Sequence, residues 1–137
     1  MALFYYNKGD ENMGILNGFM GNAQEVSLNK IKEEYSKLLI SGETIDRAFK
    51  VVRDIYIFTN KRLILIDKQG VTGKKTEYHS IPYKSITHFS VETNGHFDLD
   101  ADLKIWISGT ALPLQKNFNS STNVYEIQNI LAEYCLR

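Results

Sequence analysis

Residues 43–70 read ETIDRAFKVVRDIYIFTNKRLILIDKQG, and they open the region, residues 43–118, that decides the fold. Apolar and β-branched residues gather there in short runs, and turn-forming residues separate the runs. This pattern predicts strands at 44–52, 54–59, 62–67, 75–81, 85–93, 103–108 and 112–118. Helical spacing of apolar residues predicts helices at 27–39 and 122–136. The order of these elements predicts a mainly β (α+β) domain, a small barrel closed by a C-terminal helix.

Turn chemistry predicts where several of the strands end. Gly70 suits the positive φ of a turn after the third strand, and Gly109 marks the turn after the sixth. Asn94 and Gly95 end the fifth strand with a pair that is typical of hairpins. Pro113 has no N–H to donate to a ladder, so the last strand should lie at the edge of a sheet.

Two of the predicted strands are apolar on both faces. Residues 55–58 (IYIF) and 63–66 (LILI) do not alternate, whereas a barrel strand normally has one dry and one wet face. Burying a large apolar side chain contributes about 1.5–3 kcal/mol, so the outward-facing members need a cover. The N-terminal segment, the first helix or another subunit would each provide one. Trp106 raises the same question, because its neighbours at alternate positions take the core face.

The bulk composition bounds the class of protein. The chain has 137 residues, enough for one domain with a proper core. Its 16 basic residues balance its 16 acidic residues, which argues against non-specific nucleic-acid binding and permits self-association. One cysteine, Cys135, cannot form an internal disulfide, so no oxidising compartment is required. Without a signal-like start or a long apolar run, we expect a soluble cytoplasmic protein.

The N-terminal part differs in composition from the barrel region. Four glycines lie within residues 9–21, and each costs a helix about 1 kcal/mol relative to alanine. The apolar residues between them still need burial, so this segment should be ordered only when it packs on something. We therefore expect residues 1–42 to form a Gly-rich segment plus a helix packed on the barrel, and residues 43–137 to form the domain proper, as one structural unit.

The spacing of reactive residues assembles no catalytic or metal site. The three histidines are scattered, and Cys135 has no base near it in the sequence. Asp98, Asp100 and Asp102 alternate, which is typical of solvated carboxylates on one face of a strand. Residues 70–76 lack the glycine spacing of a phosphate-binding loop. Lys68, Lys74 and Lys75 remain as a candidate weak anion patch. We expect no enzyme activity, no cofactor and no metal.

Several motifs in order resemble the bacterial pleckstrin-homology (PH) domain family. They are FTNKRLILID at 58–67, GVTGKK at 70–75, SIPY at 80–83, FSVET at 89–93, FDLD at 97–100 and LKIWISG at 103–109. The resemblance implies a PH-like, seven-stranded bent barrel with a helix at one end, ring-like homo-oligomers and no established enzymatic activity. The link at 52–54 is too short, and too poor in basic residues, for the inositol phosphate site of eukaryotic PH domains.

These observations favour a non-enzymatic binding or scaffolding module that assembles with itself, as a closed ring such as a pentamer, or with another protein. A closed ring hides matching patches without growing into a filament. The candidate contact residues are Ile15, Leu16, Phe19, Tyr56, Phe58, Ile64 and Trp106. A peripheral membrane module, in which residues 13–20 insert shallowly into a lipid surface, is a second hypothesis. A small-ligand-binding barrel or an enzyme of unknown class is a third.

Overall fold

A computed structural model describes residues 3–7, 28–51, 53–93, 101–118 and 124–137 of the chain. The eight strands of this part are β1 (Leu3–Asn7), β2 (Ile45–Val51), β3 (Asp54–Thr59), β4 (Arg62–Gln69), β5 (Lys75–Pro82), β6 (Ile86–Thr93), β7 (Ala101–Ile107) and β8 (Leu114–Phe118). The helices are α1 (Leu28–Tyr35) and α2 (Val124–Cys135). A short 3₁₀ turn at Ser36–Leu38 follows α1, and another at Tyr83–Ser85 lies between β5 and β6.

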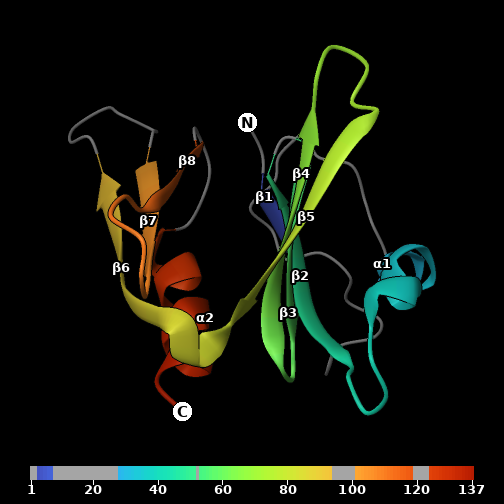
Figure 1. Cartoon of the computed structure of the whole chain (residues 1–137), viewed down its shortest axis with the longest axis horizontal. Helices are drawn as coiled ribbons and strands as arrows, with labels where there is room; N and C mark the ends of the chain where they lie inside the picture. Colours follow the sequence, from blue (N-terminus) through green and yellow to red (C-terminus); the bar gives the residue numbers. More distant parts are fainter. Residues whose placement is uncertain (1–2, 8–27, 52, 94–100, 119–123) are drawn as a thin grey trace.

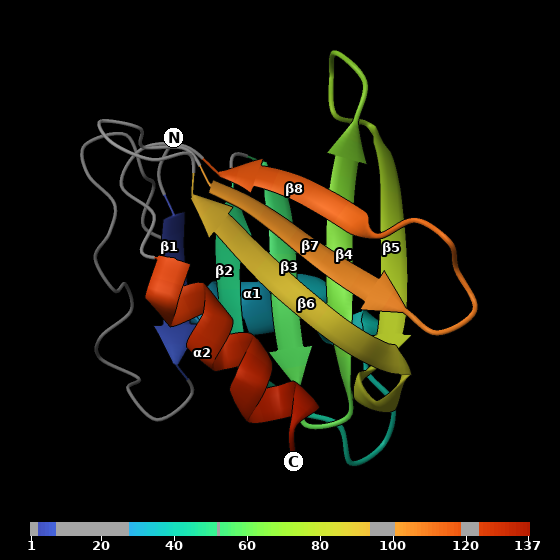
Figure 2. The same ribbon diagram turned by 90° about the vertical axis from the view of Figure 1, so that its left-hand side faces the viewer.

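The strands form two antiparallel sheets that face each other (Figure 1). The first sheet has five strands in the order β1-β2-β3-β4-β5, and the second has three in the order β6-β7-β8. The 3₁₀ turn at Tyr83–Ser85 carries the chain from one sheet to the other. Helix α2 packs at one end of the space between the sheets, and α1 lies on the outer side of the five-stranded sheet (Figures 1 and 2). The seven predicted strands are confirmed as β2 to β8.

One strand in the structure was not predicted from the sequence. β1 pairs with β2, with Tyr5 opposite Phe49 and Tyr6 opposite Ala48. Its five residues end two positions before Gly9. They lie in the Gly-rich N-terminal segment, which we expected to be ordered only when it packs on another part of the protein. An edge strand this short takes its stability from the ladder that it joins, so its local sequence is a weak signal.

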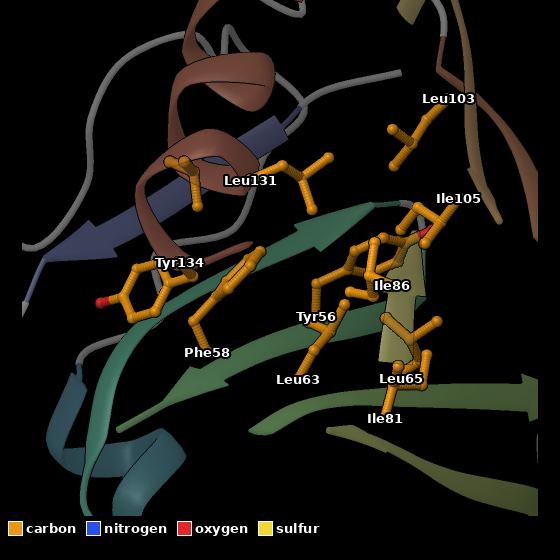
Figure 3. Packing of buried hydrophobic residues seen from close by; sticks show 11 residues of the cluster. Tyr56, Phe58, Leu63, Leu65, Ile81, Ile86, Leu103, Ile105, Leu131 and Tyr134 are labelled. Carbon is orange, nitrogen blue, oxygen red and sulfur yellow. The ribbon is translucent and has the colours of Figure 1, made fainter. Parts of the chain in front are cut away.

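The main core fills the space between the two sheets. Tyr56 and Phe58 of β3 and Leu63 and Leu65 of β4 face the second sheet, and all four are buried. They pack against Ile81 of β5 in the same sheet, against a set from the second sheet and against a set from α2; these two sets are Ile86, Leu103 and Ile105, and Ile130, Leu131 and Tyr134. Figure 3 shows Phe58 beside Tyr134, at a ring centroid distance of 5.1 Å. This cluster holds α2 across the open end of the sandwich.

A second core lies on the other side of the five-stranded sheet, beneath α1. Here Ile55 and Ile57 of β3 and Ile64 and Ile66 of β4 pack with Ile31 and Tyr35 of the helix. The non-alternating strands are thus buried on both faces, as the sequence required. Of the three covers that the sequence left open, the structure shows the first helix on this face.

Two of the predicted turns and the predicted edge residue fit the structure, whereas Asn94 and Gly95 lie outside the described residues. Gly70 and Gly109 both have positive φ, at 79° and 87°, where a side chain would be strained. Pro113 comes directly before β8, and β8 is an outer strand of the three-stranded sheet. The missing proline N–H therefore costs no ladder hydrogen bond.

Candidate functional site

A cleft of about 170 Å³ is lined by residues of β3, β4 and β5 of the first sheet and β7 and β8 of the second, and by none of α2. Its floor is apolar, and Figure 3 shows Tyr56 of β3 reaching across the space between the sheets toward Ile105 of β7. Leu65, Leu103 and Leu114 complete the floor. The rim is polar and consists of Asp67, Glu77, His79, Gln115 and Lys116.

The strand register explains why polar residues reach this cleft. In the β4–β5 ladder Leu65 lies opposite His79, and Asp67 lies opposite Glu77. Residues two apart on a strand share a face, so all four side chains project to the inner side of the sheet. The apolar face of β4 therefore becomes polar one pleat further along, where the strand leaves the core.

An ion-pair cluster at the rim joins the two sheets. Lys116 Nζ of β8 lies 3.1 Å from Asp54 Oδ2 of β3 and 3.9 Å from Asp67 Oδ1 of β4. The other oxygen of Asp54 accepts the backbone N–H of Lys68 at 3.1 Å. Burial, and then the charges of Asp54 and Asp67, raise the pKa of Tyr56 well above its usual value. Tyr56 is therefore a neutral phenol at any physiological pH.

The volume of the cleft and the residues that line it limit what it can hold. Its volume lies below the roughly 300–1,000 Å³ typical of small-molecule and cofactor pockets. Within the ranges that the structure describes, no three His, Cys, Asp or Glu residues group closely enough to hold a metal ion. Cys135 lies outside the cleft, and burial raises the pKa of its thiol to about 11, which disfavours a nucleophilic thiolate.

A second polar cluster lies at the opposite end of β3 and β4, and it is built to hold the fold together. Glu43 is buried, and the Arg62 guanidinium donates two hydrogen bonds to its carboxylate. Nε lies 2.9 Å from Oε2, and Nη2 lies 3.0 Å from Oε1. Arg62 also donates to Ser80 Oγ at 2.8 Å and to the carbonyl of Leu38 at 2.6 Å. One side chain therefore ties together the end of the 3₁₀ turn after α1, the start of β2 and strand β5.

The carboxylate of Glu43 is fully satisfied by this network. Thr59 Oγ1 donates to it at 2.7 Å, and the backbone N–H of Ile40 donates at 3.0 Å. Burial alone would raise the pKa of Glu43, but the hydrogen bonds from Arg62, Thr59 and Ile40 outweigh it and lower the pKa to about 2. Glu43 is therefore ionised throughout the physiological range.

The motif at 58–67 is explained by this network and its surroundings. Asn60 accepts the N–H of Thr44 at 2.8 Å and donates to the carbonyl of Gly42 at 3.0 Å. The Tyr83 hydroxyl donates to the Thr59 carbonyl at 2.6 Å. Thr59, Asn60 and Arg62 thus fasten the β3–β4 turn to the segments around it. These residues specify the fold, and none of them lines the cleft.

The structure separates the candidate contact residues. Tyr56 and Phe58 are buried between the sheets, and Ile64 is buried beneath α1. Their cover comes from the chain itself, so the argument from exposed apolar surface does not apply to them. Trp106 is half-buried on the outer face of β7, where its ring stacks on His88 of β6 at 4.3 Å between centroids. Ile15, Leu16 and Phe19 lie outside the described residues.

The three lysines of the candidate anion patch do not share one face. Lys68 lies opposite Thr76, and Lys75 lies opposite Gln69, so the two lysines point to opposite sides of the β4–β5 hairpin. Lys74 is exposed in the hairpin loop. Burial first, and then the charge of Lys68, lower the pKa of Lys50 of β2.

Two bent antiparallel sheets, with a C-terminal helix across one end of the space between them, define a PH-like domain. The chain belongs to the bacterial PH domain family, whose sequence pattern it matches over residues 14–135. The motif resemblance and the fold class are thereby confirmed, although among the described residues the strands form two separate sheets rather than one closed ladder.

Relatives of known sequence or structure support the assignment. The chain is 55% identical over 125 residues to the uncharacterized protein YjqA of Bacillus subtilis (strain 168), covering 90% of this chain and all of that one. It is similar to a pleckstrin-homology domain from Shewanella amazonensis SB2B, with 58% identity, a TM-score of 0.76 and coverage of 86% and 95% of the two chains. A DUF1696-family protein with such a domain from Shewanella loihica PV-4 has 53% identity, a TM-score of 0.72 and coverage of 85% and 99%.

Proposed function

We propose that the chain is a non-catalytic binding module that assembles with copies of itself through the outer face of the β6-β7-β8 sheet. The observation that carries this proposal is the stacked pair of Trp106 and His88 on that face. Tryptophan is the residue type most enriched among the residues that dominate protein–protein binding energy. In the part of the chain that the structure describes, no helix packs on the outer side of this sheet (Figure 1).

The charges on this face suit a self-complementary contact. Ser90 lies opposite Lys104, and Glu92 lies opposite Asp102, on the same side as the Trp106–His88 pair. Both signs of charge are present within one small area, and the whole chain carries a formal net charge of zero. Two copies therefore do not repel each other at long range, and a rotated copy can match acid to base.

Light scattering after size exclusion, at micromolar concentration, tests the proposal. We expect the wild-type chain to elute as a closed oligomer and Trp106→Asp to elute at lower mass with an unchanged circular dichroism spectrum. Tyr78→Asp is the matched control, because Tyr78 is an aromatic residue that is 47% exposed on the outer face of the other sheet. A strictly monomeric wild type, or an oligomer that Trp106→Asp leaves intact, would refute the proposal.

The membrane hypothesis receives no specific support. Residues 13–20, which carried it, lie outside the described residues. In the described ranges, no helix is long and apolar enough to cross a bilayer. Sedimentation with anionic vesicles remains its test, and failure to pellet would exclude it.

A further inference from the structure

The cleft is bordered by two strand edges. Within the described ranges, β5 pairs with β4 and β8 pairs with β7, and each is the outer strand of its sheet. Half of the backbone N–H and C=O groups of an edge strand point away from its sheet and form a template for another strand. β5 is the longer template, with eight residues against five in β8.

We propose that the cleft receives an extended peptide segment of a partner protein that pairs with the free edge of β5. One apolar side chain of the segment enters the cleft against Leu65 and Leu114, and a lysine or arginine two positions away lies beside Asp67 and Glu77. This is binding by strand addition, in which backbone hydrogen bonds provide affinity and alternate side chains provide specificity.

The size of the cleft favours a side chain over a metabolite. A volume of about 170 Å³ is close to the ~150 Å³ of an apolar cavity that accommodates one benzene molecule. That space suits one large apolar side chain, and it is smaller than the pockets that bury a whole small molecule. The floor of Tyr56, Leu65, Leu103, Ile105 and Leu114 offers such a side chain an almost wholly apolar contact.

The charge at the rim favours a cation next to the apolar anchor. Asp67 and Glu77 lie directly opposite each other on neighbouring strands, and like charges in that position repel. Lys116 is held closer to Asp54, at 3.1 Å, than to Asp67, at 3.9 Å. Asp54 and Asp67 therefore share one ammonium group, and Glu77 adds a third carboxylate opposite Asp67. A second cation would relieve the repulsion.

The spacing of the two contacts matches the repeat of a strand. Leu65 and His79 form one cross-strand pair, and Asp67 and Glu77 form the pair two residues further along the same face. A peptide strand paired with β5 has the same repeat. Two of its side chains that are two residues apart therefore lie beside these two cross-strand pairs, one beside each. The expected ligand pattern is therefore an apolar residue with Lys or Arg two positions away.

This site is distinct from the proposed assembly surface. Leu103 and Ile105 line the cleft from the inner face of β7, whereas Trp106 projects from the outer face of the same strand. A failure of one proposal therefore leaves the other standing.

A display library of random nine-residue peptides, panned against the full chain, tests the inference. We expect enrichment of an apolar residue with Lys or Arg two positions before or after it, and weaker binding by about fivefold to tenfold for the variant Glu77→Lys. Glu33→Lys is the matched control, because Glu33 is also an exposed glutamate but lies on α1, on the outer side of the five-stranded sheet. Enrichment of no pattern, or equal binding to Glu77→Lys and wild type, would overturn the inference.

Backbone amide NMR of the full chain with an enriched peptide locates the contact. Shifts should concentrate in Lys75–Pro82 and Leu114–Phe118, with new protection from hydrogen exchange along β5. Shifts confined to other strands would overturn the inference. So would concentration-dependent shifts of β5 and β8 without peptide, which would assign the cleft to a second copy, or equally tight binding of lysine methyl ester alone, which would assign it to a small amine.

Discussion

The two sheets of this domain differ in the cover of their outer faces. The five-stranded sheet presents Ile55, Ile57, Ile64 and Ile66 on its outer side, and α1 buries all four. The three-stranded sheet presents Trp106 on its outer side, among polar residues that face solvent. The first face contributes stability, and the second is the face through which we propose that copies of the chain assemble. A binding surface is therefore best sought on the second sheet and at the rim between the two.

The largest effect is expected from removing the ion pair between Arg62 and Glu43, which helps to hold the segment after α1 on the five-stranded sheet. Arg62→Met should lower the free energy of unfolding by about 3–5 kcal/mol, because it leaves the buried carboxylate of Glu43 without its cation. Urea denaturation followed by circular dichroism measures the change. Lys61→Met, at an exposed neighbouring position, is the control and should change stability by less than about 0.5 kcal/mol. Equal effects of the two substitutions would show that the ion pair between Arg62 and Glu43 does not contribute to the free energy of unfolding.

A smaller effect is expected from cutting the apolar contact beneath α1. Ile64→Ala should cost about 3 kcal/mol, because Ile64 is fully buried between sheet and helix and its loss leaves a cavity. Trp106→Ala, on the outer face of the other sheet, should cost less than about 1 kcal/mol in the dissociated chain. Thermal unfolding of both variants at a concentration below assembly gives the comparison. If Trp106→Ala cost as much as Ile64→Ala, the outer face of the second sheet would be structural.

The smallest expected effect comes from acid. The pKa of Glu43 is lowered from 4.5 to about 2 in the folded state, so its contribution to stability is present at neutral pH. The contribution should be lost as pH falls from about 4.5 toward 2, and about 2 kcal/mol of a total of roughly 3 kcal/mol should be lost by pH 3. Urea midpoints at several pH values for wild type and Glu43→Gln measure it. The difference in urea midpoint between wild type and Glu43→Gln should narrow with falling pH. A difference that stays constant would contradict the lowered pKa of Glu43.

The candidate site shows how far sequence reasoning reaches. Asp67 and Lys116 were assigned to strands correctly, but neither was expected at a shared site. Lys116 contacts Asp54 across a sequence separation of 62 residues, and no local pattern encodes such a pair. Alternation along β4 and β5 held the only usable signal, since it predicts that Leu65 and Asp67 share a face. Alternation also bears on the predicted anion patch. Lys68 and Lys75 project from opposite sides of the β4–β5 hairpin, so they do not share a face.

Local sequence specified strands β2 to β8, the turns at Gly70 and Gly109, the edge position of β8 and the C-terminal helix, because hydrophobic period and backbone restrictions act within a few residues. It also required that residues 55–58 and 63–66 be covered on both faces. Tertiary structure alone decided that Tyr56 and Phe58 face the second sheet, that α1 provides the outer cover, and that Asp54, Asp67 and Lys116 meet. Those outcomes depend on how whole elements pack, and packing joins residues that the chain keeps far apart.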